Sequence, residues 1–291
     1  MDRIKYDIYL KMTEDQVKIR FYIPRGKNEI TVCDSLNQAY EICRNHGLQV
    51  DWIVEDDLVN IFKLQRIQDL PEIVVLDHLS SGSTVENLLQ LCREGILTLV
   101  GPQCLLMCLQ RNCPIPDTRH PVISGALRGC VVTSSGVSNV EDRQRLRGLV
   151  QRMWGEWSDS LHDGVTHLVA ATVLSDKYRA AVGAGVPVMA VSWLEEVWRA
   201  AVSEADGAVS GVEPRFSGHK CPPLLGVRVS VSQLERADRD LISRSVEAGG
   251  GEYSGVLDTE CSVLVCLTSR GDKGPCVKNV ICLISQNQKD N

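Results

Sequence analysis

Short apolar runs alternate with longer amphipathic segments along much of this 291-residue chain. In its middle third, a β-rich run from Cys130 to Thr133 precedes a segment with apolar residues at i, i+3, i+4 and i+7: Leu146, Leu149, Val150 and Met153. This spacing places the four side chains on one face of a helix. Short strands that alternate with such helices indicate a small parallel sheet with helices on its faces.

The same stretch predicts four further elements. We expect a strand at 166–170, a helix from about Lys177 to Val182, a strand at 186–191 and a last helix from Trp193 to Ala201. Two local signals mark the helix ends: Gly183-Ala184-Gly185 ends the first helix, and Ser192 is the expected N-cap of the second. We expect Trp193 to be core, Trp198 to be partly buried, and His167 to be a packed, hydrogen-bonded strand residue and not a base.

The residue pattern also repeats. Asp142-Arg143 and Gly155-Glu156 recur 96 positions later as Asp238-Arg239 and Gly251-Glu252, and the run at 129–135 recurs 97 positions later. A repeat of this length predicts two copies of one folded unit. Trp154 stands where the second copy has Gly250; since bulky residues avoid positive φ, we expect an altered turn there.

Residues 1–123 are less regular, but their second half keeps the same order of elements. It predicts a strand at 73–76, a helix at 83–93, a strand at 97–100 and a helix at 103–111. We therefore expect a divergent first copy. It should pack on the second through the apolar segment 103–109 and the proline-bearing segment 113–121.

Several of these motifs resemble the BRCT domain family. They are the Gly before an aromatic residue in the turn, T-H-L-V at 166–169, D-K-Y-R-A-A at 176–181 and V-S-W-L-E-E-V-W at 191–198. The order of the copies is similar to the triple BRCT arrays of replication and checkpoint scaffolds. The BRCT region of a Rho exchange factor is the related alternative. The resemblance implies an α/β fold of tandem BRCT domains, each a four-stranded parallel sheet flanked by about three helices.

We divide the chain on this basis into a divergent first repeat (1–113), a joint (114–123), a second repeat (124–203), an acidic linker (204–218) and a third repeat (219–291). The third repeat is expected to be incomplete at its C-terminal end, because Gly274-Pro275 stand where a helix should begin. After Val265 we expect one more strand, at 280–284. This pattern is typical of a fragment or an aberrant gene product.

The resemblance implies a scaffold that binds phosphoserine or phosphothreonine peptides, and no enzyme activity. In the family, a Ser or Thr at the end of the first strand, the following N–H, an Arg early in the first helix and a Lys at the start of the second helix hold the phosphate. The matching residues are Ser135, Gly136, Arg143 and Lys177 in the second repeat, with Ser134 as the alternative hydroxyl, and Ser232, Gln233, Arg239 and Lys273 in the third. The first repeat offers no matching set.

These residue types also suit a phosphate on physical grounds. A phosphorylated side chain carries about −1.5 to −2 charges and three acceptor oxygens. Lys supplies a full positive charge, Arg a forked donor, and a helix N-terminus adds a favourable dipole. The resemblance further implies a nuclear protein whose partners are the phosphorylated tail of the checkpoint clamp and a phosphorylated replication-initiation factor.

Charge and cysteine content argue against several classes of function and of binding site. The net charge is −6, and residues 124–203 carry eight basic and eight acidic side chains, which argues against general DNA or RNA coating. A BRCT array that binds DNA ends or other nucleic acid is therefore an alternative that the charge disfavours. No signal peptide or membrane-spanning stretch is visible. Cys104, Cys108 and Cys113 with His120 could hold zinc, but their apolar neighbours favour buried thiols. We expect no metal, cofactor, small-molecule substrate or membrane contact, and a reducing compartment.

Overall fold

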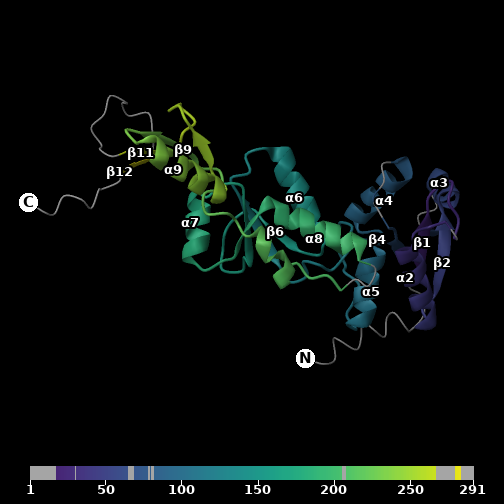
Figure 1. Cartoon of the computed structure of the whole chain (residues 1–291). Coiled ribbons are helices and arrows are strands. Elements are labelled where there is room, and N and C mark those ends of the chain that lie inside the picture. The colour runs from purple at the N-terminus through teal and green to yellow at the C-terminus, as the bar shows by residue number, and fades with distance from the viewer. Residues whose placement is uncertain are drawn as a thin grey trace, which may run out of the picture. The chain divides into compact units, whose positions relative to one another are not determined.

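The computed structural model describes residues 18–29, 31–64, 69–77, 79, 82–204 and 208–266, together with the backbone of residues 279–282. Within these residues the chain forms three four-stranded sheets of parallel strands, labelled in Figure 1. By its contacts the chain divides into two compact units, which are described separately: Met1–Val131, Gln144–Trp157 and Trp193–Ser217 in the first, and Val132–Arg143, Ser158–Ser192 and Gly218–Asn291 in the second.

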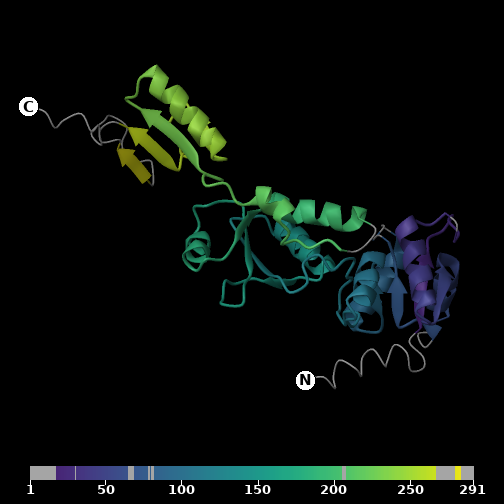
Figure 2. The ribbon, with the colours of Figure 1, turned by 60° about the horizontal axis from the view of Figure 1, so that its bottom comes forward.

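The first repeat is a complete sheet with strand order β2-β1-β3-β4. Its strands and helices are β1 (Ile19–Ile23), α2 (Asp34–Asn45), β2 (Val50–Val54), α3 (Glu55–Lys63), β3 (Ile73–Val75), α4 (Ser83–Glu94), β4 (Thr98–Val100) and α5 (Pro102–Gln110). Helices cover both faces of this sheet (Figure 2), so β1, β3 and β4 are largely buried, whereas the edge strand β2 is partly exposed. The four elements expected in the second half are confirmed to within a residue or two, and the first half adds two strands and two helices that the sequence pattern did not reveal.

The second repeat has the same strand order, β6-β5-β7-β8. Its elements are β5 (Val131–Ser135), α6 (Val140–Arg152), β6 (Glu156–Ser158), β7 (His167–Ala170), α7 (Asp176–Gly183), β8 (Val188–Ala190) and α8 (Val191–Ser203). The predicted apolar face of α6 is confirmed, because Leu146, Leu149, Val150 and Met153 are all buried. Trp193 is fully buried and Trp198 partly buried, as expected.

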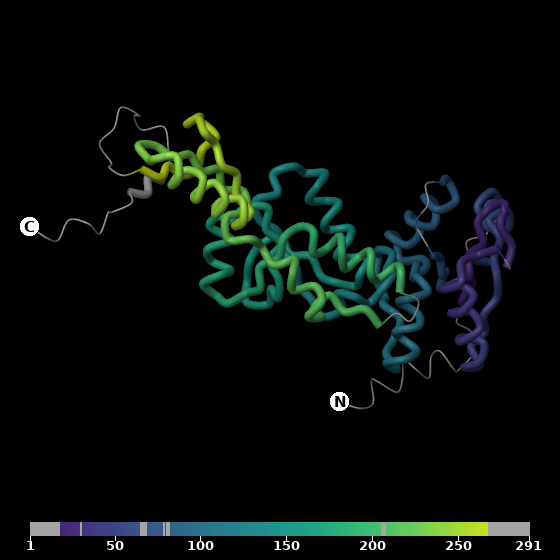
Figure 3. Tube along the Cα trace, in the orientation of Figure 1, coloured from purple at the N-terminus to yellow at the C-terminus, as the bar shows by residue number. Residues whose placement is uncertain are grey.

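The third repeat again has the order β10-β9-β11-β12. After the 3-10 helix η2 (Pro214–His219), its elements are β9 (Arg228–Ser232), α9 (Arg236–Ala248), β10 (Glu252–Ser254), β11 (Val263–Cys266) and β12 (Asn279–Cys282). The strand expected at 280–284 is therefore present, shifted toward its N-terminus. The other expectations for residues 267–278 and 283–291, including Gly274-Pro275, lie outside the described residues. Figure 3 follows the three repeats in chain order.

Strand register confirms the internal repeat. In the second repeat Val132 pairs with His167, and in the third Val229 pairs with Val263. These positions differ by 97 on the first strand and by 96 on the other, the same offsets that align the two sequences. The one-residue difference therefore lies between the first strand and the next, and the pairing itself is unchanged.

Two details of the sequence interpretation are wrong. Ser192 is not an N-cap, because α8 begins one residue earlier, at Val191, directly after β8. The sequence pattern predicts an apolar face of α9 made of Leu241, Ile242 and Val246, but the Leu241 side chain is 58% exposed. Val246 is buried and Ile242 packs beside it on Val227 and Val229, so the helix contacts its sheet along a narrower stripe.

The turn at Trp154 is not altered, contrary to expectation. Trp154 adopts a left-handed backbone with φ of 63°, close to the 77° of its counterpart Gly250. A left-handed conformation costs a residue with a side chain about 1–2 kcal/mol. Two contacts of the indole offset this cost: it packs against the first-repeat cluster that includes Leu105 and Met107, and Arg128 lies over its ring. Here packing overrides the local preference for glycine.

Helix α5 packs where the sequence predicted. Residues 102–108 of this helix are all buried, and a Cβ on Gly125 would lie 2.4 Å from the Met107 side chain. At the end of the joint, the backbone N–H groups of Ile123 and Ser124 donate to the carbonyl of Arg152. Within the first unit, α5 thus packs beside Gly125 at the start of the second repeat, and the end of the joint is hydrogen-bonded to the last turn of α6.

Further observations concern the buried cysteines, potential metal ligands and the length of the helices in the described residues. Cys104 and Cys108 are buried in α5, and the hydrogen bond with Cys104 together with burial raises the pKa of Cys108 far above its usual range. No group of three or more potential metal ligands is found among the described residues. In the same part of the chain, every helix is too short or too polar to cross a bilayer.

Candidate functional site

A small polar cavity lies at the carboxyl ends of β5 and β7 in the second repeat. Its volume is about 320 Å³, and all its lining residues belong to the second compact unit. The parallel register brings the end of β5 beside the loop that leads to α7. Every residue expected to bind phosphate in this repeat lines the cavity: Ser134, Ser135, Gly136, Arg143 and Lys177, together with Val137 and Asp159.

Lys177 is the central charge of this cavity. Its ammonium nitrogen Nζ donates to Thr133 Oγ1 at 3.3 Å, to the Ser134 carbonyl at 3.0 Å and to the Asp159 carbonyl at 2.9 Å. Burial lowers the pKa of Lys177, the nearby Arg143 lowers it further, and the Asp159 carboxylate opposes them. All three partners of the ammonium are oxygens of neutral groups, so an anion could replace one and gain a charge-assisted bond.

Helix α7 sets the position of Lys177. Ser175 is the N-cap of this helix, and its hydroxyl accepts a hydrogen bond from the Tyr178 N–H. Lys177 therefore lies in the first helical turn, next to backbone N–H groups that lack partners within the helix. The same Ser175 hydroxyl is hydrogen-bonded to Ser135, which ties the end of β5 to the start of α7.

The two candidate hydroxyls differ in their surroundings. Ser135 is 6% exposed, whereas Ser134 is half-buried. Because Ser175 Oγ already accepts from Tyr178, it can donate its own hydrogen to Ser135, which leaves the Ser135 hydrogen free for a ligand. This network favours Ser135 as the hydroxyl donor and leaves Ser134 as a cavity wall.

Gly136 and Arg143 shape the loop after β5. Gly136 has φ of 76°, and a Cβ at this position would lie 2.5 Å from Thr172 Cγ2. A side chain is thus excluded by both backbone conformation and space. The exposed Arg143 donates through Nη2 to the Val137 carbonyl at 3.1 Å, so its guanidinium is held beside the cavity.

The third repeat reproduces part of this arrangement. Ser232 ends β9, and Gln233 follows with φ of 61°, where the second repeat has Gly136. Arg239 Nε donates to the Leu234 carbonyl at 2.7 Å, which matches the bond from Arg143 to Val137. Lys273, the expected ammonium of this repeat, lies outside the described residues.

In the first repeat a carboxylate lies at the corresponding strand end, and Thr84 holds the position in α4 that Lys177 holds in α7. Glu55, at the start of α3, accepts hydrogen bonds from the Arg25 N–H at 2.8 Å and from Thr84 Oγ1 at 3.0 Å. Arg25 follows β1 and Thr84 is in the first turn of α4, the elements that correspond to β5 and α7. These bonds lower the pKa of Glu55, and burial with the Glu55 charge raises the pKa of Tyr22 to about 12.

Each repeat has a recess between the end of its first strand and the first turn of the helix that follows its third strand. We call this recess the strand-end notch. The sequence motifs identified the basic residues and the Ser135 hydroxyl of the second notch but not Thr133, Asp159 and Ser175. Thr133 could have been predicted from the sequence, since it is two residues before Ser135 and therefore on the same face of the strand. Glu55 had no such signal, because the hydrogen bonds that place it come from Arg25 and Thr84, both far from it in the sequence.

Two segments of the chain, residues 130–193 and 227–274, match the twin BRCT domain family. The chain therefore carries a tandem BRCT fold. Protein ECT2 from mouse and from human are 28% and 29% identical to it over 167 and 168 residues. Each alignment covers 57% of this chain and 18% of the relative, so the chain matches less than a fifth of the length of either protein.

Solved BRCT structures are also similar. The first two BRCT domains of Rad4 in complex with a Crb2 phosphopeptide are 21% identical with a TM-score of 0.43, covering 51% of this chain and 80% of that chain. The first BRCT domain of the DNA-repair protein XRCC1 is 27% identical with a TM-score of 0.24, covering 25% and 57%.

Proposed function

We propose that this tandem BRCT chain is a scaffold module that binds phosphoserine or phosphothreonine peptides through the strand-end notch of its second repeat. One observation carries the proposal: Lys177, the Ser135 hydroxyl and the loop at Gly136 line a single cavity of about 320 Å³ beside a helix N-terminus. The Rad4 domains, which share the fold, were solved with a phosphopeptide bound. BRCT repeats are protein-interaction modules, and we assign no catalytic role to the cavity.

The energetics of the cavity suit a short phosphopeptide. A charge-assisted hydrogen bond contributes roughly 1.5–3 kcal/mol, and Lys177, Arg143 and Ser135 can supply three or four such bonds. After the ordering cost of the peptide, about −8 kcal/mol remains, which corresponds to a dissociation constant near 1 μM. The phosphate is bound as a dianion, so affinity should fall as the pH drops through its second pKa of about 6.

The biological setting that we propose follows the resemblance in copy order to the amino-terminal triple-BRCT region of DNA topoisomerase II-binding protein. In that setting the module is nuclear and acts in replication initiation and the DNA-damage checkpoint. Its ligands are then the phosphorylated tail of the checkpoint clamp and a phosphorylated replication-initiation factor.

A second setting is favoured by the similarity to ECT2. If the chain is the regulatory BRCT region of a Rho exchange factor, the same notch binds a phosphopeptide of a different partner. Calorimetric titration of the full chain with clamp-tail phosphopeptides and their unphosphorylated twins tests the proposal. Tight binding that requires the phosphate supports the checkpoint setting, phosphate-dependent binding to other sequences alone supports the exchange-factor setting, and equal binding of each twin rejects the function.

A further inference from the structure

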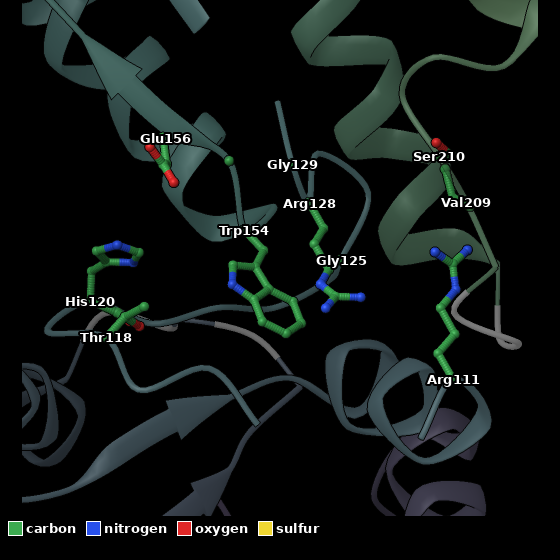
Figure 4. Close-up of a pocket in the computed structure, with 11 residues that line it drawn as sticks. Arg111, Thr118, His120, Gly125, Arg128, Gly129, Trp154, Glu156, Val209 and Ser210 are labelled. Carbon is green, nitrogen blue, oxygen red and sulfur yellow. The ribbon is translucent and has the colours of Figure 1, made fainter. Parts of the chain in front are cut away.

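A larger cavity lies in the first compact unit, where the joint meets the start of the second repeat. Its volume is about 560 Å³. Arg111, at the end of α5, Arg128, in the loop before β5, and His120, in the joint, line it; in the view of Figure 4 the Trp154 ring lies between His120 and the two arginines. Glu156 is the acidic side chain of its lining, and Trp154 and Val209 supply apolar surface.

The two arginines of this cavity carry charges that no described carboxylate neutralises. Seven arginines of the described chain form ion pairs, and Arg111 and Arg128 are not among them. The Arg128 guanidinium lies 5.0 Å from the centre of the Trp154 ring. Stacking of this kind holds a guanidinium in place while its N–H groups stay available to an anion.

His120 separates this cavity from a second one of about 410 Å³, which it also lines. Arg93, Arg119 and Arg152 line the second cavity together with Glu86. These three arginines also lack an ion-pair partner among the described side chains. The His120 Nδ1 atom is buried without a hydrogen-bond partner in the described structure, which leaves an unsatisfied polar group between the two cavities.

We propose that these two cavities, which we call the joint surface, together bind an acidic peptide segment. The segment would cross His120 and place carboxylate or phosphate groups in both cavities. Five arginines against two glutamates give the joint surface a net charge of +3 in a chain of net charge −6. This local excess of positive charge attracts anions.

The shape of the joint surface favours a peptide over a nucleic acid. Each cavity combines its arginines with a carboxylate and with apolar side chains, which are Trp154 and Val209 in one and Leu79 and Leu89 in the other. Alternating acidic and apolar side chains complement such hollows. A nucleic-acid backbone instead requires a continuous basic track, and the two carboxylates and the acidic chain would repel it.

Fluorescence anisotropy of the full chain tests this assignment with three labelled octapeptides. One alternates Glu with Leu, the second has phosphoserine at the Glu positions, and the third has Gln there. We expect the two acidic peptides to bind and the Gln peptide not to bind. Arg111→Gln and Arg119→Gln, one in each cavity, should each weaken binding of the Glu–Leu peptide about tenfold, the loss of one charge-assisted bond.

Matched variants make the result specific. Arg44→Gln removes an exposed arginine of α2 in the same unit and should leave binding unchanged. The Glu–Leu peptide carries no phosphate, so a loss of its binding in the two cavity variants separates the joint surface from the strand-end notch. Equal binding of the Gln peptide, or a loss caused by one of the two cavity variants alone, would overturn the proposal. So would tighter binding of a short DNA duplex that both cavity variants weaken.

Discussion

The first and second repeats share one sheet topology but present opposite charges at the strand-end notch. In the second repeat the notch is lined by the Lys177 ammonium and the Ser135 hydroxyl. In the first repeat, the N–H after β1 and a hydroxyl of α4 both donate to the Glu55 carboxylate. A built-in carboxylate thus occupies donors of the kind that the second repeat can offer to a phosphate. One fold can therefore serve as a ligand site in one copy and as a closed structural support in another.

The largest effect should come from reversing the charge of the second notch. We expect Lys177→Glu to reduce phosphopeptide affinity at least 100-fold, or about 3 kcal/mol, because an attractive charge becomes a repulsive one. The melting temperature should change little, since Lys177 is only half-buried at a helix start. Titration calorimetry and thermal melting measure the two effects.

Arg179→Glu is the matched control for this variant. Arg179 lies on the same helix, is exposed and pairs with Asp176. Such a surface pair contributes about 0–1 kcal/mol to stability. If Arg179→Glu weakened binding as strongly as Lys177→Glu, general electrostatic attraction would account for binding in place of the notch.

The next effect concerns the glycine that forms the loop of the second notch. We expect Gly136→Ala to destabilise the chain by about 2 kcal/mol or more, because the added Cβ combines a left-handed backbone with a close approach to Thr172. Gly148→Ala is the control: its Cβ would meet no atom within 4 Å, and it lies inside α6. Chemical denaturation should show a loss for the first and a small gain for the second.

A smaller loss of stability is expected from a substitution in the first notch. Glu55→Gln should lower the free energy of unfolding by about 1–2 kcal/mol, since it weakens the bonds from Arg25 and Thr84. It should not create phosphopeptide binding in the first repeat. Because the folded-state pKa of Glu55 is lowered, its stabilisation is present above the unfolded-state pKa of about 4.3 and is lost as the pH falls through the folded value.

The pH dependence of the unfolding free energy shows whether Glu55 stabilises the fold as a charged carboxylate or only as a neutral hydrogen-bond acceptor. Denaturation curves at several acidic pH values should show a steeper loss of stability in the wild type than in Glu55→Gln. Parallel curves would mean that Glu55 titrates alike in the folded and unfolded chains, and the view of Glu55 as a built-in anion would fail.

The smallest expected change in stability concerns the residue after the first strand, which differs between the second and third repeats. Gln233 holds the left-handed position that Gly136 holds in the second repeat. Gln233→Gly should therefore stabilise the third repeat by about 1 kcal/mol. Hydrogen exchange at β9 and β11 measures the change; faster exchange in the variant would show that contacts of the Gln233 side chain outweigh the backbone cost.

The parts of the fold that the sequence predicted are those with local signals. Apolar spacing found α6, and the repeat offsets matched the strand register to the residue. The failures have specific causes. Trp154 keeps its left-handed turn because the indole packs on α5 and under Arg128, a contact across the joint that no local rule includes. Glu55 escaped notice because its partners are about 30 residues away on either side.

Amide NMR of the ¹⁵N-labelled full chain, titrated with a phosphoserine peptide, tests the contrast between the two notches most directly. The account predicts shifts at the amides of Gly136 and Tyr178 in the second notch and none at Arg25 and Thr84 in the first. The shifts at Gly136 should vanish in Lys177→Glu. Equal shifts in both notches, or shifts at Gly136 that persist in Lys177→Glu, would contradict the claim that the second notch binds a phosphate through Lys177 and the first notch does not bind one.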